Sequence, residues 1–199
     1  MDKPFAPACE RNKASILELL RELYADRRHV LEIGSGTGQH AVHFAAALPQ
    51  LQWQCTELAE NLPGLRLWLD EAALPNLPPP RLLDVNQPLP EGPWDAVFSA
   101  NTLHIMGWPE VEQLFDGLAL RLPLHGLFTV YGPFNIGGRF SSESNARFDA
   151  QLRSADARRG IRDLEAVDAL AVRAGLKLLD DRAMPANNRC LSWQRVALR

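Results

Sequence analysis

Apolar and polar residues follow one another in segments that switch repeatedly between a helical and a strand period. Residues 14–25 place Ile16, Leu20 and Leu23 on one helical face, whereas residues 51–58 indicate a short strand. Prolines and glycines bound most of these segments. We predict strands at residues 29–36 (with a terminal turn), 51–58, 81–85, 94–101 and 126–134, and helices at residues 14–25, 38–49, 61–74, 108–122, 141–155 and 163–175.

The end of the chain changes this alternation. Residues 176–184 and 189–198 both have strand character, and the short polar stretch "PANN" separates them, which predicts a hairpin. Strands that alternate with helices imply a mostly parallel sheet covered on both faces. The pattern therefore predicts an α/β fold with three αβα layers, seven strands and a C-terminal antiparallel hairpin. We expect a single domain over residues 1–199, with a lid or helix segment at residues 1–27.

The stretch "VLEIGSGTGQH" (30–40) is the first candidate for chemistry. A short apolar strand ends at a glycine loop with Gly34, Gly36 and Gly38 at alternate positions. Glycines after a strand allow tight turns and a close approach of the backbone to a ligand. A nucleoside triphosphate loop requires G-x-x-x-x-G-K-[ST], and none of the three lysines of this chain is near a glycine loop. That ligand class is excluded.

Two ligand classes remain for the glycine loop. A dinucleotide fingerprint has the spacing G-x-G-x-x-G, whereas Gln39 occupies the place of its third glycine here. Glu32 precedes the first glycine by two residues, and we expect its charge to face the mouth of the loop. A carboxylate is unfavourable beside a pyrophosphate and favourable beside a cation. The loop, with Ser35 included, therefore favours S-adenosylmethionine, which has no phosphate and carries an ammonium and a sulfonium.

Polar residues close the later strands, at the sheet edge where open α/β sheets bind ligands. Glu57, followed by Leu58, ends the second strand about 20 residues after the loop, as a ribose-binding acid does. The alternative for Glu57 is a surface carboxylate. Asp84, followed by Val85, is placed to accept a hydrogen bond from adenine, although a capping role fits it nearly as well. Asn101, at the end of the fourth strand, is expected beside the methionine part of the cofactor.

Charge and composition narrow the choice of partners. The formal net charge is −3 and the 21 basic residues are scattered, with Arg158, Arg159 and Arg162 the densest group, so we expect no nucleic-acid partner. No run of 18 apolar residues exists, so we expect no membrane partner. Three widely spaced cysteines indicate reduced thiols, and the polar first residues lack the apolar region of a secretory signal. These features predict a cytoplasmic protein.

Seven segments together carry a family resemblance: "ERNK", "VLEIGSGTGQHAVHFA", "FSANTLHIMGW", "GPF", "SESNARFDAQLR", "GIRDLE" and "MPANN". With them the chain resembles class I methyltransferases that use S-adenosylmethionine, and more narrowly the methyltransferase-like protein 26 family. The resemblance implies the Rossmann-like methyltransferase fold and its cofactor, without a settled substrate. It also implies that Glu32 and the three loop glycines form the first cofactor motif, that Glu57 is the ribose acid and that Asp84 is the adenine-side acid.

Several polar residues are candidates for catalysis or for binding of substrate or cofactor. His104 follows the fourth strand and is the best candidate for a general base, although a histidine satisfied at a helix start fits equally well. Tyr131 is a weaker catalytic candidate and fits a wall of the site better. Arg11, which precedes the first predicted helix, could reach the cofactor carboxylate or be a surface cap. The candidate substrate residues are Asn12, Asn135, Asn145 and Asn187, the last of which also fits a plain turn residue.

No metal site is expected. His40 and His43 lie one helical turn apart, but the sequence suggests no third ligand. Methyl transfer from a sulfonium depends largely on positioning, so no residue is forced to be catalytic.

The sequence thus predicts an enzyme that transfers a methyl group from S-adenosylmethionine to a small molecule. A protein methyltransferase and a catalytically silent cofactor-binding module of the same fold remain alternatives. A nicotinamide oxidoreductase of the short-chain type requires Tyr-x-x-x-Lys, and neither Tyr24 nor Tyr131 is followed by that lysine. A nucleic-acid amide methylase is disfavoured because the residues after the fourth strand, Asn101 to His104, lack the two prolines of its motif.

Overall fold

The structure is a computed structural model that describes residues 2–197. Residue 1 and residues 198–199 lie outside the described part, and with them the ends of the predicted domain 1–199 and the last residue of the predicted strand 189–198. The described chain divides into two compact units. The first unit holds residues 2–84 and 90–98, and the second holds residues 85–89 and 99–197. A single domain therefore stays a prediction.

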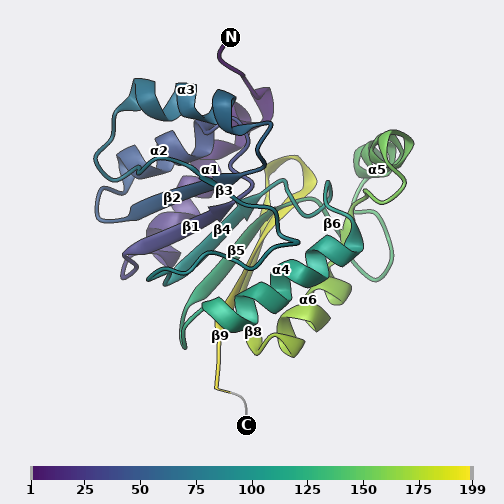
Figure 1. The fold of residues 1–199 in the computed structure, drawn as a ribbon. Helices are drawn as coiled ribbons and strands as arrows, with labels where there is room; N and C mark the ends of the chain where they lie inside the picture. Colours follow the sequence, from purple (N-terminus) through teal and green to yellow (C-terminus); the bar gives the residue numbers. More distant parts are fainter. Residues whose placement is uncertain (1, 198–199) are drawn as a thin grey trace. The chain divides into compact units, whose positions relative to one another are not determined.

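The first unit contains three helices that pack one beside the next, together with short parallel strands (Figure 1). Its elements in chain order are α1 (Pro7–Leu23), β1 (His29–Ile33), α2 (Gln39–Ala47), β2 (Gln52–Glu57), α3 (Leu62–Ala72) and β3 (Arg81–Leu82). Its core is aromatic: the rings of Phe44, Trp53 and Phe98 lie 5.5–5.6 Å apart, and all three are fully buried. Burial of such large side chains is the main stabilising contribution to this unit.

The second unit contains the later helices and the C-terminal hairpin. Its elements are α4 (Trp108–Arg121), β5 (Leu127–Gly132), β6 (Phe134–Asn135), α5 (Glu143–Ala155), β7 (Arg162–Asp163), α6 (Leu164–Arg173), β8 (Leu176–Met184), the 3-10 turn η1 (Pro185–Asn187) and β9 (Asn188–Arg195). In Figure 1, α4 and α6 lie side by side, and α5 lies apart from this pair. Phe115, Phe128 and Trp193 form its aromatic core, and the Trp193 indole donates to Asp168 at 2.8 Å.

Seven strands within residues 2–197 form one sheet in the order β3-β2-β1-β4-β5-β9-β8, where β4 spans Ala96–Ala100. β1 pairs in parallel with β2 and with β4, and β9 pairs antiparallel with β5 and with β8. This confirms the predicted α/β fold with a mostly parallel seven-stranded sheet and a C-terminal antiparallel hairpin. The described helices include none long and apolar enough to cross a membrane.

Two element predictions were wrong in their extent, and one pair of short strands was not predicted. The first helix begins at Pro7 rather than at residue 14. The sequence did not predict this start, because the first two turns are largely solvent-exposed and carry no apolar period. Proline suits the first helical position, where no N–H partner is needed. The strand predicted at residues 81–85 ends at Leu82, because its partner β2 ends at Glu57. Two-residue strands β6 and β7 pair in a separate small sheet that is too short to show any sequence period.

Candidate functional site

The loop between β1 and α2 requires glycine at alternate positions. Gly34, Gly36 and Gly38 have φ of +70°, +55° and +90°, a left-handed conformation that other residues rarely adopt. Their surroundings differ. A Cβ on Gly38 would lie 2.7 Å from Leu65 Cδ1, so Gly38 allows α3 to pack closely against the loop. A Cβ on Gly36 would meet nothing within 4 Å, so Gly36 presents bare backbone to open space.

Glu32 lies beneath this loop and does not face its mouth as the sequence suggested. Its Oε2 accepts hydrogen bonds from Ser35 Oγ at 2.8 Å and from the indole of Trp53 at 3.0 Å. The side chain is only 2% exposed, and burial raises the pKa of Glu32 above its ordinary value. In this geometry Glu32 ties the loop to β2, and Ser35 closes the same network by accepting from the Thr56 amide.

Glu57 fixes the tip of the glycine loop. Its Oε2 accepts from the Gly36 amide at 2.7 Å, and its Oε1 accepts from the Leu58 amide at 2.9 Å and from Asn61 Nδ2 at 3.2 Å. A carboxylate offers about four acceptor positions, so one remains for a ligand hydroxyl without loss of the others. The structure thus brings the predicted ribose acid and the glycine loop into direct contact, and adds Asn61, which stands four residues after Glu57 and directly before α3.

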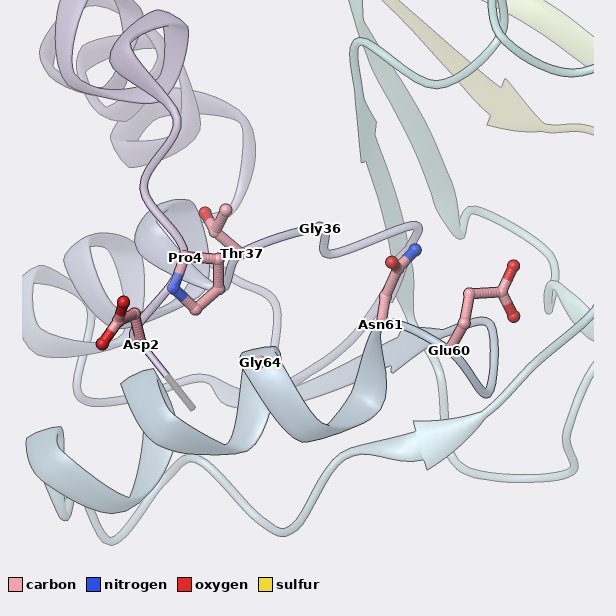
Figure 2. Close-up of a pocket in the computed structure, with 7 residues that line it drawn as sticks. All are labelled: Asp2, Pro4, Gly36, Thr37, Glu60, Asn61 and Gly64. Carbon is pink, nitrogen blue, oxygen red and sulfur yellow. The ribbon is translucent and has the colours of Figure 1, made fainter.

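A cavity of about 350 Å³ opens beside the glycine loop (Figure 2). Figure 2 shows Gly36 and Thr37 on the loop side and Asn61 reaching up from the start of α3 toward Gly36. The volume is at the lower end of the range for small-molecule sites. Among the described residues that line it, the charged groups are carboxylates and none is basic. Its lining residues are Asp2, Pro4, Gly36, Thr37, Glu60, Asn61 and Gly64.

Residues 2–6 form a wall of this cavity and are fastened to α3. The Trp68 indole donates to the Pro4 carbonyl at 2.6 Å. Lys3 Nζ lies 3.6 Å from the centre of the Trp68 ring and 2.7 Å from Glu71 Oε2. Pro4 fits against Gly64, where a Cβ would come within 2.8 Å of Pro4 Cγ. We call residues 2–6 the N-terminal strap.

Arg11 and Asn12 lie inside α1, so the expectation that they precede the first helix was wrong. Arg11 is exposed. Asn12 is buried, and its Oδ1 is 2.6 Å from Nε2 of His40. Burial lowers the pKa of His40 to about 4, so His40 is neutral at physiological pH and contributes to the α1–α2 contact. No cluster of three or more His, Cys, Asp or Glu side chains able to hold a metal occurs among residues 2–197.

The other predicted cofactor residues are less enclosed. Leu58 is 40% exposed directly after Glu57. Asp84 is half-buried two residues beyond the end of β3, and it is the last residue of the first unit before Val85 begins the second. Of the predicted cofactor residues, the structure therefore joins Glu32, Ser35, Gly36 and Glu57 by hydrogen bonds within the first unit.

In the second unit, Asn101 and His104 stand next to the end of β5. Asn101 directly follows β4 and has φ of +58°, a conformation that asparagine tolerates better than most residues, and its amide donates to the Tyr131 carbonyl at 2.8 Å. A Cβ on Gly132 would lie 3.7 Å from His104 Nδ1 and 3.9 Å from Asn101 Oδ1. Gly132 therefore leaves a methyl-sized space between these two side chains.

His104 is 6% exposed, and its ring meets Phe148 of α5 edge-on with centroids 5.3 Å apart. Burial, assisted by the charge of Arg162, lowers the pKa of His104 to about 4. The imidazole is therefore neutral at physiological pH and can accept a proton. Tyr131 is 2% exposed within β5, which suits the wall that the sequence suggested.

The candidate substrate asparagines of this unit differ in their bonding. Asn145 is buried and donates to Ser141 Oγ at 2.8 Å and to the Asn187 carbonyl at 3.1 Å, so it joins the start of α5 to the hairpin turn. Asn187 has φ of +58°, as a turn residue does. Asn135 Oδ1 is buried without a hydrogen-bond partner among the described residues, which leaves it able to accept from a ligand.

Sequence reasoning missed several groups that the structure brings to these sites. Asn61 was detectable in principle, because a polar residue one turn after the ribose acid can reach back to it. Trp68, Phe148 and the role of Arg162 had no local signal, because each meets its partner across a long stretch of chain.

Solved structures of methyltransferases have this fold. An O-methyltransferase family protein from Burkholderia thailandensis matches with a TM-score of 0.80 at 16% identity, over 96% of this chain and 58% of that one. An O-methyltransferase family 2 protein from Planctomyces limnophilus, solved in complex with apigenin, matches at 0.81 and 16%, over 95% and 58%. NcsB1, an O-methyltransferase from neocarzinostatin biosynthesis solved with S-adenosylmethionine and 2-hydroxy-5-methyl naphthoic acid, matches at 0.77 and 16%, over 96% and 55%.

The chain spans a little over half the length of each of these proteins. At such identities the comparison defines the fold, which is the Rossmann-like fold of class I methyltransferases. Residues 3–195 match the model of one protein family. The chain belongs to this family, which is described as protein of unknown function (DUF938).

Proposed function

We propose that this chain is a methyltransferase that uses S-adenosylmethionine and acts on a small molecule. The observation that carries the proposal is the cavity of the first unit, where bare backbone at Gly36 meets carboxylates and, within residues 2–197, no basic side chain. A phosphate-bearing dinucleotide would be repelled by Asp2 and Glu60, whereas a ligand with an ammonium and a sulfonium would be attracted. We also propose that the chain is related to the methyltransferase-like protein 26 family and that the protein is cytoplasmic.

Within the proposal, the cofactor-binding residues each have a defined task. When bound, S-adenosylmethionine supplies a methyl group activated by a positively charged sulfur. Gly36 permits the close approach of the ligand to the loop backbone. Glu57 accepts from a ribose hydroxyl with its remaining acceptor position, and Asn61 keeps that carboxylate oriented. The N-terminal strap contributes Asp2 and Pro4 to the wall of the cavity. Arg11 is proposed for the cofactor carboxylate, and Leu58, Asp84 and Val85 are proposed for the adenine.

His104 is proposed as the general base of the second unit. Its neutral ring would accept the proton of an acceptor hydroxyl, and the bound cofactor would supply the methyl group that this oxygen receives. A base with a pKa of about 4 is weak, so an acidic hydroxyl such as a phenol suits it better than an alcohol. Asn101 and Asn135 offer amide groups for orienting the acceptor, Tyr131 provides a wall, and Asn145 and Asn187 support the loops around it.

Calorimetry with S-adenosylmethionine, S-adenosylhomocysteine and NADH tests this proposal. Both adenosyl ligands should bind, and NADH should not. Glu57→Ala should weaken cofactor binding by about 1–3 kcal/mol, the cost of losing a charged hydrogen bond, whereas Asp116→Ala on the exposed surface of α4 is the control. Transfer of a labelled methyl group to an extract of small metabolites then separates an enzyme from a silent binding module. Tight NADH binding, or an unchanged affinity in Glu57→Ala, contradicts the proposed site.

A further inference from the structure

Arg162 is the buried member of the basic group Arg158, Arg159 and Arg162. Arg162 as a whole residue is only 8% exposed. The side chain of Arg158, by contrast, is 66% exposed and forms ion pairs with Asp156 and Glu110. A buried guanidinium is costly unless each donor has a partner. The hydrogen-bond partners of Arg162 include three backbone carbonyls, and two of them, those of Leu103 and Met106, lie on either side of His104 in the chain.

The Arg162 guanidinium donates hydrogen bonds to carbonyls that come before and after His104 in the turn of residues 103–106. Its Nε donates to the Leu103 carbonyl at 3.0 Å, and its Nη2 donates to the carbonyls of Met106 and, at 3.0 Å, of Arg158. The Gly160 amide donates to the carbonyl of His104 itself at 3.0 Å. Residues 103–106 are therefore held on the segment that leads into β7, and a planar, charged fork is the group best suited to such multiple acceptors.

The segment that carries Arg162, residues 158–162, is itself held by contacts with α5 and α4. Asp149 on α5 accepts from the Ile161 amide at 2.7 Å and from Arg153 Nε at 2.7 Å. The Arg162 guanidinium lies over the Trp108 ring, with its carbon 5.9 Å from the ring centre. These contacts pre-orient Arg162, so it transmits the position of α5, which also carries Phe148, to the imidazole.

We propose that Arg162 is a positioning residue for His104: it holds the 103–106 turn in one geometry and brings a positive charge close to the imidazole. This proposal rests on the proposed function only for the use that the enzyme makes of His104. The charge effect has a definite sign. A cation beside an imidazole disfavours the imidazolium, so loss of the Arg162 charge makes protonation of His104 easier.

Other charged groups in the neighbourhood act on Arg162 rather than directly on the imidazole. Asp149 and Glu110 stabilise its charge, and Arg153 opposes it. Phe148 of α5 and Gly132 of β5, which face the ring from the other elements, carry no charge. Arg162 remains charged at neutral pH although burial lowers its pKa, because arginine starts from a very high value.

Two variants separate the effect of the Arg162 charge from the effect of its hydrogen bonds to the turn. Arg162→Met removes both, whereas Arg162→Lys keeps a positive charge on a group that cannot reach three carbonyls at once. Arg158→Met is the matched control, since it removes one positive charge from the same group without touching the turn. The ligand-free proteins are compared by NMR titration of the His104 ring, identified by its absence in His104→Gln, and by hydrogen exchange of residues 101–107.

Arg162→Met should titrate His104 at a higher pH than the wild type, and Arg162→Lys should not. Both variants should exchange the amides of residues 105 and 106 about tenfold faster, the factor expected for loss of one charge-assisted hydrogen bond, and Arg158→Met should match the wild type in both measurements. Unchanged exchange in Arg162→Lys, or an unmoved His104 titration in a folded Arg162→Met, overturns the proposal.

These measurements need no methyl transfer, so they fail independently of the proposed function. If the chain transfers methyl groups, Arg162→Lys should in addition lower kcat by about 10- to 100-fold with unchanged cofactor affinity, because small displacements of a catalytic group have effects of this size. A wild-type kcat in Arg162→Lys would overturn the positioning role. Absence of methyl transfer in the wild type, with the NMR shifts as expected, would overturn the proposed function alone.

Discussion

Gly36 and Gly137 have almost the same backbone conformation, with φ of +55° and +58°, and a Cβ at either would meet nothing within 4 Å. Valine at either position should therefore cost a similar amount of stability, about 1–2 kcal/mol for a left-handed residue. Only Gly36 lines the cavity of the first unit. We expect Gly36→Val to abolish S-adenosylmethionine binding in calorimetry and Gly137→Val to retain it. Equal affinities in the two variants would remove the ligand from this loop.

A second glycine probes the surroundings of His104. Alanine at position 132 would place a methyl group 3.7 Å from His104 Nδ1 and 3.9 Å from Asn101 Oδ1, both ordinary contact distances. Gly132→Ala should therefore fold normally but add a methyl group between His104 and Asn101, the two groups proposed to meet the acceptor. We expect kcat/KM for the acceptor to fall by about 10- to 100-fold while the cofactor dissociation constant stays constant. Full activity in this variant would mean that the acceptor does not enter that space.

At the scale of elements, the N-terminal strap packs against α3 beside the cavity. Gly64 lies inside α3, where alanine is favoured by about 1 kcal/mol. Its Cβ, however, would come within 2.8 Å of Pro4 Cγ and force the strap away. Gly64→Ala should thus keep or raise the melting temperature while weakening cofactor binding about fivefold, the loss expected for one hydrogen bond.

Trp68→Phe provides the matched comparison for Gly64→Ala. It keeps an aromatic ring for Lys3 but removes the donor to the Pro4 carbonyl. The two variants should weaken binding to a similar extent, because both release the same strap. If stability rises in Gly64→Ala and affinity is unchanged, the strap does not close the cavity over the ligand.

The elements also show which parts of the fold could be predicted from the period of apolar residues. Strands such as β1 and β5, which are buried throughout or nearly so, were predictable from their apolar runs. The first two turns of α1 were not, since their side chains are mostly exposed and carry no period. The β6–β7 pair was beyond sequence reasoning, because two residues contain too little pattern and the pairing joins Asn135 to Asp163 across the whole α5 excursion.

For the whole molecule, two buried histidines set the response to acid. His40 in the first unit and His104 in the second both have a pKa lowered to about 4 from the ordinary 6.5. The unfolded chain therefore takes up protons near pH 6.5 that the folded chain refuses until about pH 4. Stability should be complete above pH 6.5 and fall as the pH drops toward 4, by up to about 3 kcal/mol per histidine. Glu32 opposes this, since a raised carboxyl pKa contributes stability at low pH that is lost as the pH rises.

Urea unfolding at pH 7 and pH 5 measures this response. His40→Gln and His104→Gln should each reduce the difference between the two pH values, because glutamine does not titrate. His29→Gln is a control, since His29 is only half-buried at the start of β1. A difference that survives both substitutions would assign the acid sensitivity to other groups.

The sequence by itself determined the order of the strands and helices, the three left-handed glycines after β1 and the carboxylate at the end of β2. These are local properties, because apolar period and backbone conformation depend on neighbouring residues. Only the tertiary structure decided that Glu32 is buried under Trp53, that Pro4 lies on Gly64, and that Arg162 holds the turn of His104. Each of these contacts joins residues 21 to 60 positions apart, and side-chain direction and burial at such distances arise from packing, which no local pattern encodes.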